Sequence, residues 1–460
     1  MKTGLFVLLG LFCLGMLFNC SNPTASTYSV TYDGNGASSG SVPTDSNKYK
    51  EGATVTVLGN TGSLAKTSYT FAGWNTKSDG SGTGYGVGVT FSMGSANVTL
   101  YAVWIQNLTY TVTYSGNGST SGNDPTDTNN YKQGATVIVL GNTGNLTLSG
   151  YNFAGWNTNA NGSGTSYAAG ATFTMASANI TLYAVWIPSN LTFTSSGTYI
   201  IITGYTTAPI GSLAIPGGVT NINPQAFFTC SSLTSVTIPS SVTSIGSLAF
   251  GACAGLTSIS VDSDNPNYES ISGVLFDKSG TTLLQAPCAL TGNYAIPTSV
   301  TSIGDCAFEE SALTSVTIPS SVTSIGVEAF AEAGLTSVII PSSITSIGTD
   351  DFIQCTNLAS VTIPSSVTSI GNGAFGGCTS LTSVTIPSGV TSIDNGAFDG
   401  CTLLNSVTVM ATTPPALPSG SLAFSNCANT LKIYVPSDYV DTYKNATGWK
   451  DYASIIYSQS

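Results

Sequence analysis

A fourteen-residue stretch that recurs without a charged residue constrains the fold most. Residues 313–326 read LTSVTIPSSVTSIG, the same letters stand at 233–246, and close variants begin at residues 335, 358 and 381. The Ile-Pro steps of this unit fall at Ile215, Ile238, Ile296, Ile318, Ile340, Ile363 and Ile386. Successive steps are 22 or 23 residues apart, except for one interval of 58 residues. A repeat period near 23 residues predicts a solenoid of stacked coils.

Within one unit, the pattern predicts a short strand with two different faces. Leu313, Val316 and Ile318 point into the core, whereas Ser315 and Thr317 alternate outward. The motif L-x-x-V-x-I-P-x-x-V-x-x-I-G-x-x-A-F resembles the BspA-like leucine-rich repeat, also known from treponemal surface proteins. This resemblance implies adhesion to host matrix proteins or to other cells, and residues 261–288 resemble the island of that family.

A second, longer repeat lies before the solenoid. The segment that begins YSVTYDGNG at Tyr28 is echoed from Tyr110, and the motifs FAGWNT and LYAVWI both recur 82 residues later without a gap. Alternating apolar residues predict strands, and the DGNG and GNTG motifs predict turns. These units resemble the B repeat of internalin B, the Listeria-Bacteroides repeat. The resemblance implies small β-grasp-like modules that serve as a stalk or weak adhesive element. The fixed place of the Trp residues in alternating strands favours core packing over a carbohydrate platform.

These patterns predict a mainly β protein with two small β-grasp-like repeat modules followed by a leucine-rich-repeat solenoid. The expected domains are a lipoprotein signal peptide (1–19), a tether (20–27), module 1 (28–105), module 2 (108–187) and a BspA-like domain with a C-terminal cap (190–460).

The charge composition excludes several classes of function. Only 7% of the residues are charged, the net charge is -12, and the chain contains no Arg and no His. A chain with so little positive charge is not expected to bind nucleic acid. The absence of His excludes Ser-His and Cys-His catalytic pairs and imidazole metal ligands. We therefore expect no enzyme, no cofactor and no metal site.

The N-terminus has the pattern of an export signal. Lys2 precedes an apolar run from Leu5 to Phe18, which is too short to span a bilayer as a mature helix. The run ends in Leu-Phe-Asn-Cys, which resembles a bacterial lipobox and implies lipid attachment at Cys20. An ordinary signal peptide with a chance Cys20 remains the alternative. With lipidation, N-terminal acyl chains would be the only membrane contact, and we expect the protein at the outer membrane or cell surface, or otherwise secreted.

The outward residues of the repeat are the candidate binding residues. Their hydroxyl groups both donate and accept hydrogen bonds, although Ser and Thr also simply suit exposed strands. The proposed ligand-binding face consists of Ser235, Thr237, Ser315, Thr317, Ser337, Ser360, Thr362, Ser383, Thr385, Ser406 and Thr408. Regular Thr spacing also suggests an ice-binding solenoid as a remote alternative. This alternative is weakened because one of the two outward rows consists of Ser and the other contains Ile339.

Two further files of residues follow from the repeat. Six Cys residues each lie three positions after a repeat Phe, where a small apolar filler is the simpler interpretation and a disulfide between neighbouring coils the alternative. They are Cys230, Cys253, Cys355, Cys378, Cys401 and Cys427.

Acidic residues gather at one corner, where solvated charge is expected and a weak cation site is the alternative. They are Glu309, Glu310, Glu328, Glu332, Asp350 and Asp351. In the island, Asp262, Asp264 and Asn265 prompt the same two interpretations, with a plain turn favoured.

The function predicted from the sequence is binding. We expect a lipid-anchored surface protein whose solenoid contacts a host extracellular-matrix protein, a glycan or another cell surface. The alternative is a structural spacer or envelope protein with no soluble ligand.

Overall fold

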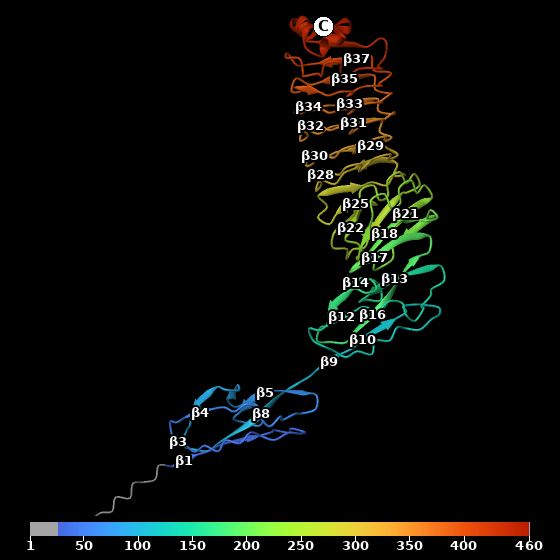
Figure 1. The fold of residues 1–460 in the computed structure, drawn as a ribbon. Coiled ribbons are helices and arrows are strands. Elements are labelled where there is room, and N and C mark those ends of the chain that lie inside the picture. The colour runs from blue at the N-terminus through green and yellow to red at the C-terminus, as the bar shows by residue number, and fades with distance from the viewer. Residues whose placement is uncertain (1–25, 460) are drawn as a thin grey trace, which may run out of the picture. The chain divides into compact units, whose positions relative to one another are not determined.

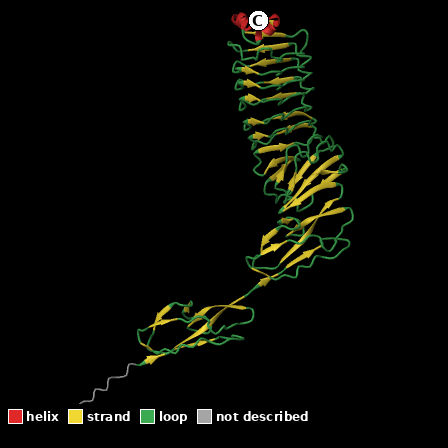
Figure 2. Ribbon diagram, viewed as in Figure 1, coloured by secondary structure: helices red, strands yellow, loops and turns green. Residues whose placement is uncertain are grey.

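The computed structural model describes residues 26–459, so the expected signal peptide and Cys20 lie outside the described residues. The chain divides into two compact units, one up to Thr109 and one from Tyr110 onward. Nearly all regular structure is β, and a few short helices occur near the C-terminus (Figure 2). The predicted fold class, mainly β with repeat modules before a solenoid, is confirmed.

Module 1 (residues 28–105) is built on a four-stranded sheet in the order β2-β8-β5-β6, with two small two-stranded sheets beside it. Strands β2 and β8 are parallel, whereas β5 pairs antiparallel with both β8 and β6. The strands are β1 (Thr27–Tyr28), β2 (Val30–Asp33), β3 (Tyr49–Lys50), β4 (Thr54–Thr56), β5 (Tyr69–Asn75), β6 (Gly84–Tyr85), β7 (Thr90–Ser92) and β8 (Val98–Gln106).

Module 2 (residues 108–187) repeats this sheet in the order β10-β16-β13-β14, with a register that is shifted by 82 residues throughout. Its strands are β9 (Thr109–Tyr110), β10 (Val112–Ser115), β11 (Tyr131–Lys132), β12 (Thr136–Ile138), β13 (Tyr151–Asn157), β14 (Ser166–Tyr167), β15 (Thr172–Thr174) and β16 (Ile180–Pro188). Trp74 and the equivalent Trp156 are almost fully buried, and each indole N–H donates to a backbone carbonyl, 2.9 and 2.8 Å away. The expectation that these Trp residues pack in the core is confirmed.

The solenoid stacks one coil per repeat, as Figure 1 shows from β28 to β37. Its first parallel file of strands, here called the front ladder, carries the L-x-S-V-x-I segments. The front ladder consists of β19 (Gly211–Ala214), β21 (Leu233–Ile238), β23 (Ser258–Val261), β27 (Gly292–Ala295), β29 (Leu313–Thr317), β31 (Ser337–Ile339), β33 (Ser360–Thr362), β35 (Ser383–Ile386), β37 (Ser406–Val409), β38 (Lys432–Val435) and β39 (Ile456–Ser458).

A second parallel file, the back ladder, is formed by the Ser-Ile steps on the return path of each coil. Its strands are β20 (Asn221–Ile222), β22 (Ser244–Ile245), β28 (Ser302–Ile303), β30 (Ser324–Ile325), β32 (Ser346–Ile347), β34 (Ser369–Ile370) and β36 (Ser392–Ile393). A hairpin of β17 (Leu191–Ser196) and β18 (Tyr199–Tyr205) starts this file, because β18 pairs with β20.

A file of Phe rings fills the corner of the solenoid. Neighbouring rings stack with centroids 5.0 to 5.5 Å apart and nearly parallel planes, as from Phe308 to Phe330 and on to Phe352. At most corners the backbone is bonded to the next coil, since the Phe N–H donates to the carbonyl of the residue before the following Phe, as at Phe330 and Phe352. The repeated A-F step therefore specifies both the core and the attachment of one coil to the next.

The island and the C-terminal cap interrupt or end the repeat. The island adds β24 (Tyr268–Ile271), β25 (Val274–Asp277) and β26 (Thr282–Gln285), and β26 leads back into the back ladder through β28. The cap contains the 3-10 helices Ser437–Tyr439 and Trp449–Ile455 and the short helix α1 (Val440–Asn445). Trp449 is fully buried under the last coil, so the apolar end of the stack is covered.

Module 2 packs directly onto the first hairpin of the solenoid. Val185 and Ile187 of β16 belong to the same buried cluster as Leu191 and Ile200 of the hairpin. The Ser166 hydroxyl donates to the Gly218 carbonyl at 2.7 Å, and the Ala168 N–H donates to the carbonyl of a hairpin-turn glycine at 2.8 Å. One face of module 2 thus shares a core with the first coils of the solenoid, whereas Trp156 and its neighbours form a separate core inside the module.

Candidate binding face

The eleven predicted face residues all lie on the front ladder, and none of their side chains is buried. Adjacent strands hold them in register, because Ser337 pairs with Ser360 and Thr385 with Thr408. The apolar residues between them, such as Val338 and Val384, are almost fully buried. The alternation of the repeat therefore places two parallel rows of polar side chains above a buried apolar core. We call the eleven residues the Ser/Thr face.

The hydroxyl groups of this face are largely unpartnered. Among the described residues, only Ser315 uses its side chain within the protein, donating to Asn293 at 2.7 Å. The Thr residues just before the back-ladder strands behave differently, since Thr323, Thr368 and Thr391 each donate to a carbonyl of the preceding coil at 3.0 to 3.3 Å. The hydroxyls of these three Thr residues are thus occupied in the stack, whereas those of the Ser/Thr face, apart from Ser315, are available to a ligand.

The island divides the face into two parts. Ser235 and Thr237 pair with Ser258 and Ser260 on β23, but the next neighbour of β23 is the island turn, where the Gly273 carbonyl accepts the Ile259 N–H at 2.8 Å. The longer part runs from β29 to β37 and spans roughly 20 Å at the usual strand spacing. Sequence reasoning did not predict this interruption on the front side.

Sequence reasoning also missed an aromatic extension at the C-terminal end of the face. Tyr434 pairs in register with Thr408, and Tyr457 pairs with Tyr434. The Lys432 ammonium lies 5.4 Å from the ring centroid of Tyr457, and the Tyr457 side chain is 43% exposed. The signal was present in the alternating segment LKIYVP, which continues the strand pattern without the Ile-Pro step. Exposed Tyr beside a cation is typical of binding surfaces.

The file of Cys residues is structural. The six predicted thiols are free, and five of them donate to a Phe carbonyl of an adjacent coil at 3.0 to 3.3 Å, for example Cys355 to Phe330. Burial raises the pKa of the Cys355 and Cys401 thiols to about 12, so they are protonated and unreactive at neutral pH. The small-filler interpretation is favoured over disulfides, with a weak hydrogen bond that sequence reasoning did not foresee.

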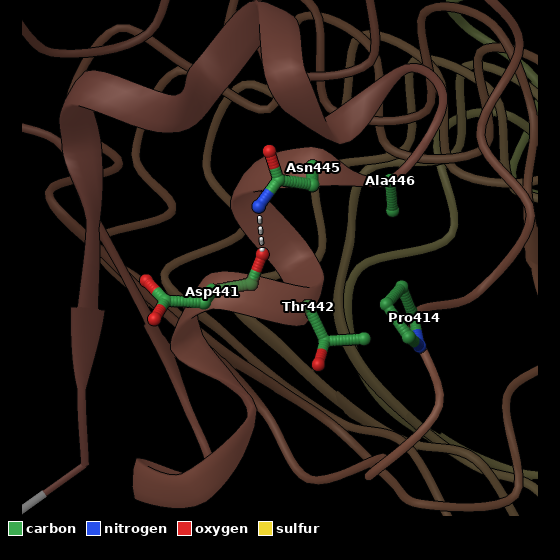
Figure 3. Close-up of a pocket in the computed structure, with 5 residues that line it drawn as sticks. All are labelled: Pro414, Asp441, Thr442, Asn445 and Ala446. Carbon is green, nitrogen blue, oxygen red and sulfur yellow. Dashed lines mark hydrogen bonds between the residues drawn. The ribbon is translucent and has the colours of Figure 1, made fainter.

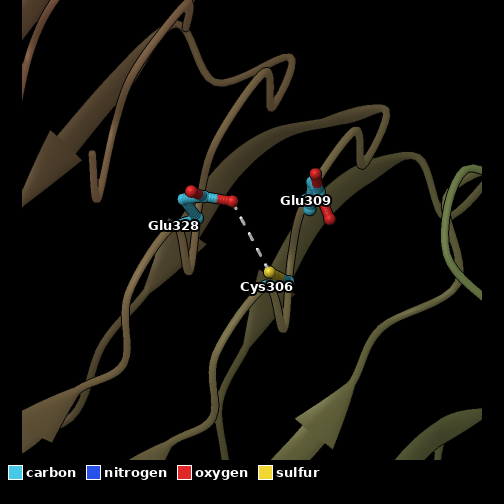
Figure 4. A group of neighbouring side chains, drawn as sticks. All are labelled: Cys306, Glu309 and Glu328. Carbon is cyan, nitrogen blue, oxygen red and sulfur yellow. Dashed lines mark hydrogen bonds between the residues drawn. The ribbon is translucent and has the colours of Figure 1, made fainter. Parts of the chain in front are cut away.

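The acidic corner is only partly solvated, because Cys306, Glu309 and Glu328, drawn in Figure 4, are each half-buried. The potential ligand atoms of these three side chains lie within 4.8 Å of one another. Burial, helped by the neighbouring carboxylates, raises the pKa of Glu309 and raises that of Cys306 to about 12. These three side chains by themselves do not establish a metal site, and the weak cation site considered from the sequence stays a prediction.

Asp351 corrects the expectation of solvated charge at this corner. It occupies the Ala position of the A-F step, is fully buried, and accepts a hydrogen bond from the Gly348 N–H at 2.6 Å. Its other carboxyl oxygen has no hydrogen-bond partner. Burial first, and then the nearby Asp350 and Asp305, raise the pKa of Asp351 to about 7.

The island residues form a turn, as favoured from the sequence. The buried Asn265 amide donates to the carbonyls of Pro239 and Val242 at 2.8 and 2.9 Å, and its carbonyl accepts two backbone N–H groups. Asp262 accepts the Asp264 N–H in a local turn. These side chains attach the island to the preceding coil.

The cap carries an open hollow beside α1, drawn in Figure 3. It is lined by Pro414, Asp441, Thr442, Asn445 and Ala446. The Asn445 amide donates to the Asp441 carbonyl within the helix at 2.7 Å, and most of the lining is exposed. This hollow contains no convergent polar groups that would hold a ligand. Within residues 26–459, no helix has the length and apolar character that a bilayer-crossing segment needs.

Comparison with known families follows the two repeat systems. The model of the BspA-type leucine-rich repeat region matches residues 198–291, 286–405 and 368–450, which together cover more than half of the chain. The chain belongs to this family. The Listeria-Bacteroides repeat domain matches residues 28–103 and 110–185. Both predicted resemblances are confirmed.

Individual proteins are similar to parts of the chain. A protein of Evansella cellulosilytica that carries the name of a Gly-rich membrane protein is 37% identical over 164 residues, which are 35% of this chain and 18% of the relative. The chain thus matches less than a fifth of that relative. A solved leucine-rich-repeat protein from Eubacterium ventriosum is 28% identical, with a TM-score of 0.42, covering 47% of this chain and 65% of the other. The leucine-rich-repeat protein of T. pallidum is 27% identical, with a TM-score of 0.26, covering 47% and 90%.

Proposed function

We propose that the chain is a surface-displayed binding protein whose Ser/Thr face contacts a host extracellular-matrix protein, a glycan or another cell surface. One observation carries the proposal. The side chains of the Ser/Thr face are exposed or half-buried and almost all unpartnered, whereas Thr323, Thr368 and Thr391, just before the back-ladder strands, are hydrogen-bonded within the stack. Membership of a repeat family found in surface proteins supports a binding role.

The aromatic extension adds the kind of residue that dominates binding energies. A flat face of small hydroxyl side chains has few groups that bury much area, but Tyr434 and Tyr457 continue it with two rings about 6.3 Å apart. We therefore place the energetic centre of the face toward β37, β38 and β39.

The proposal is tested by charge substitution on matched ladders. In the whole protein, Thr317→Lys, Thr362→Lys and Thr385→Lys are combined on the face, and Thr323→Lys, Thr368→Lys and Thr391→Lys are combined on the back ladder as a control of equal charge. Solid-phase binding to fibronectin, laminin, fibrinogen and a glycan array is then compared with the wild type. We expect the face variant to lose saturable binding and the control to keep it. Equal loss in both variants would remove the face from consideration.

The surface location is proposed to depend on Cys20. The expectation rests on the lipobox-like sequence, which lies outside the described residues, and the relatives named as membrane proteins agree with a surface location. Cells that express Cys20→Ala should release the protein into the medium and should not incorporate labelled fatty acid into it. Retention on the membrane with no label in the wild type would leave the lipid anchor without support.

A further inference from the structure

A hollow on the return side of the solenoid arises where the island shortens one corner. Leu283 pairs with Ile303, and the Ala286 N–H donates to the next coil in the way that the Phe308 N–H does. Only two residues separate Leu283 from Ala286, whereas four separate Ile303 from Phe308. The corner of this coil is therefore two residues shorter and lacks the Phe ring. Space opens between the coils on either side of it.

The hollow has a volume of about 260 Å³. This is below the range of sites for drug-sized ligands, and it suits one side chain with part of its backbone. Its walls are mainly apolar and include Ile245, Leu248, Leu284 and the ring of Tyr268, with Leu275 buried beneath. Ser247, Asp305 and Cys306 are the more exposed polar lining residues.

Two backbone donors at the corner that contributes Leu248 to the hollow lack the partners found at the other corners. In the other coils, the corner Phe N–H donates to the following coil at 2.7 to 2.9 Å, as at Phe227, Phe308, Phe330, Phe352, Phe375 and Phe398. The N–H groups of Leu248 and Phe250 have no such acceptor among the described residues, because the next corner is the shortened one. Buried backbone donors without a partner are rare in folded proteins, so this corner offers hydrogen bonds that the protein itself does not use.

Gln285 supplies a second, independent feature. Its side chain lines the hollow, is only 8% exposed, and makes no hydrogen bond to any described residue. A Gln amide offers both a donor and an acceptor, which is the pattern that complements a peptide group. The Tyr268 hydroxyl accepts the Ile245 N–H at 3.0 Å and keeps its own proton for donation.

We propose that this hollow binds an aliphatic side chain of a protein partner together with its adjoining peptide group. The apolar walls take the side chain, and Gln285 and the Leu248 N–H bond the peptide group. The inference deepens the proposed function, because it rests on a protein as the partner. The exposed Asp305 carboxylate beside the hollow and the net charge of -12 disfavour a fatty acid or another carboxylate as the occupant.

The test uses a small neutral probe and needs no knowledge of the natural partner. N-acetyl-leucine methylamide is titrated into full-length protein labelled with ¹⁵N at Leu and Phe, and the amide signals of Leu248 and Phe250 are followed. We expect saturable downfield shifts with a dissociation constant in the millimolar range. N-acetyl-glycine methylamide should bind at least tenfold more weakly because it lacks the side chain, and 4-methylpentanoate should bind at least fivefold more weakly because of its charge.

A matched pair of variants tests the role of the amide. Gln285→Leu should weaken binding of the leucine probe at least fivefold, whereas Gln354→Leu, on an exposed corner of the regular stack, should leave it unchanged. Circular dichroism checks that both variants are folded, and the three wild-type titrations remain decisive if Gln285→Leu is not. Absence of saturable shifts at Leu248 and Phe250, or equal affinity for the carboxylate, would overturn the proposal. Neither result depends on the matrix-protein assay, so failure of the hollow and failure of the Ser/Thr face are distinguishable.

Discussion

Modules 1 and 2 have nearly the same sequence and the same sheet, yet they meet different surroundings. Ile105 is 61% exposed in module 1, whereas the equivalent Ile187 is fully buried against the hairpin of the solenoid. The exposed Gly84 is replaced by Ser166, which is buried and bonded to Gly218. The repeat thus specifies a fold, and a few substitutions together with the next domain decide whether one face of it becomes core.

The substitutions at this junction follow a physical pattern. Lys77 and Asp79 of the module 1 loop are replaced by Asn159 and Asn161 in module 2, where the loop lies against Gly217. Removing charge from a loop that packs onto another backbone avoids the cost of desolvating ions. Module 2 therefore covers the first hairpin of the solenoid as a cap, while module 1 keeps a polar and exposed surface at the same positions.

The largest difference in stability between the modules is expected when a charge replaces the equivalent residues Ile187 and Ile105. Ile187→Asp removes a buried aliphatic side chain and buries a carboxylate, so the second unit should lose about 5 kcal/mol of unfolding free energy. Ile105→Asp changes an exposed side chain and should cost less than about 1 kcal/mol. Urea denaturation of the whole chain measures both. Similar losses of unfolding free energy in the two variants would contradict the different burial of Ile187 and Ile105.

The next largest effect is a pH dependence of stability that is expected in the second unit. Because the folded-state pKa of Asp351 is raised to about 7, the folded state binds an extra proton between pH 4 and 7, and stability falls as the pH rises through this range. The shift corresponds to about 4 kcal/mol less stability of the second unit at pH 8 than at pH 4.

The control for this prediction is the consensus residue of the repeat. Asp351→Ala should raise the melting temperature at pH 8 and remove most of the pH dependence, since Ala stands at this position in the neighbouring coils. Melting is followed between pH 4 and 8. A wild-type unit whose stability rises over that range would contradict the buried, raised-pKa carboxyl.

A smaller contrast is expected at two equivalent glycines. Gly162 and Gly80 both have φ near +80°, but a Cβ on Gly162 would overlap the Gly217 backbone, whereas one on Gly80 would meet nothing within 4 Å. Gly162→Ala should cost about 3 kcal/mol, through the left-handed backbone and a displaced junction. Gly80→Ala should cost only about 1 kcal/mol. Denaturation curves in which the two variants coincide would show that the junction is loose.

The smallest contrast concerns the hydroxyl at the junction. Ser166→Gly recreates the module 1 residue and leaves the Gly218 carbonyl without its donor, for an expected loss of about 1 to 2 kcal/mol. The reverse change in module 1, Gly84→Ser, adds an exposed hydroxyl and should change stability by less than about 0.5 kcal/mol. Both values come from the same denaturation assay, and a neutral Ser166→Gly would show that this bond contributes nothing.

Much of this architecture was predictable from the sequence because repeats encode it redundantly. The strand alternation at Leu313, Ser315 and Val316 and the Phe of each corner recur often enough to define both faces and the core. What the repeats could not show is where they fail. The shortened corner at Ala286 and the buried Asp351 depend on how one coil departs from the consensus, and only packing against its neighbours reveals the result.

The candidate site was predictable in part for the same reason. The eleven residues of the Ser/Thr face follow from the register of identical units, but alternation does not encode which of their hydroxyls are bonded, as Ser315 is, and which are unpartnered. Tyr434 and Tyr457 lie in the cap, where the repeat motif has ended, so their register with Thr408 emerged only from the stacked strands. The burial of Ile187 was hidden because its sequence environment is nearly that of Ile105.

Amide hydrogen exchange of the whole chain tests whether module 2 is built into the solenoid while module 1 folds by itself. The equivalent strands β8 (Val98–Gln106) and β16 (Ile180–Pro188) serve as internal controls for each other. We expect the backbone amides of β16 to exchange at least tenfold more slowly than those of β8, and we expect Ile187→Asp to abolish this difference. Equal protection of the two strands in the wild-type chain would contradict this expectation.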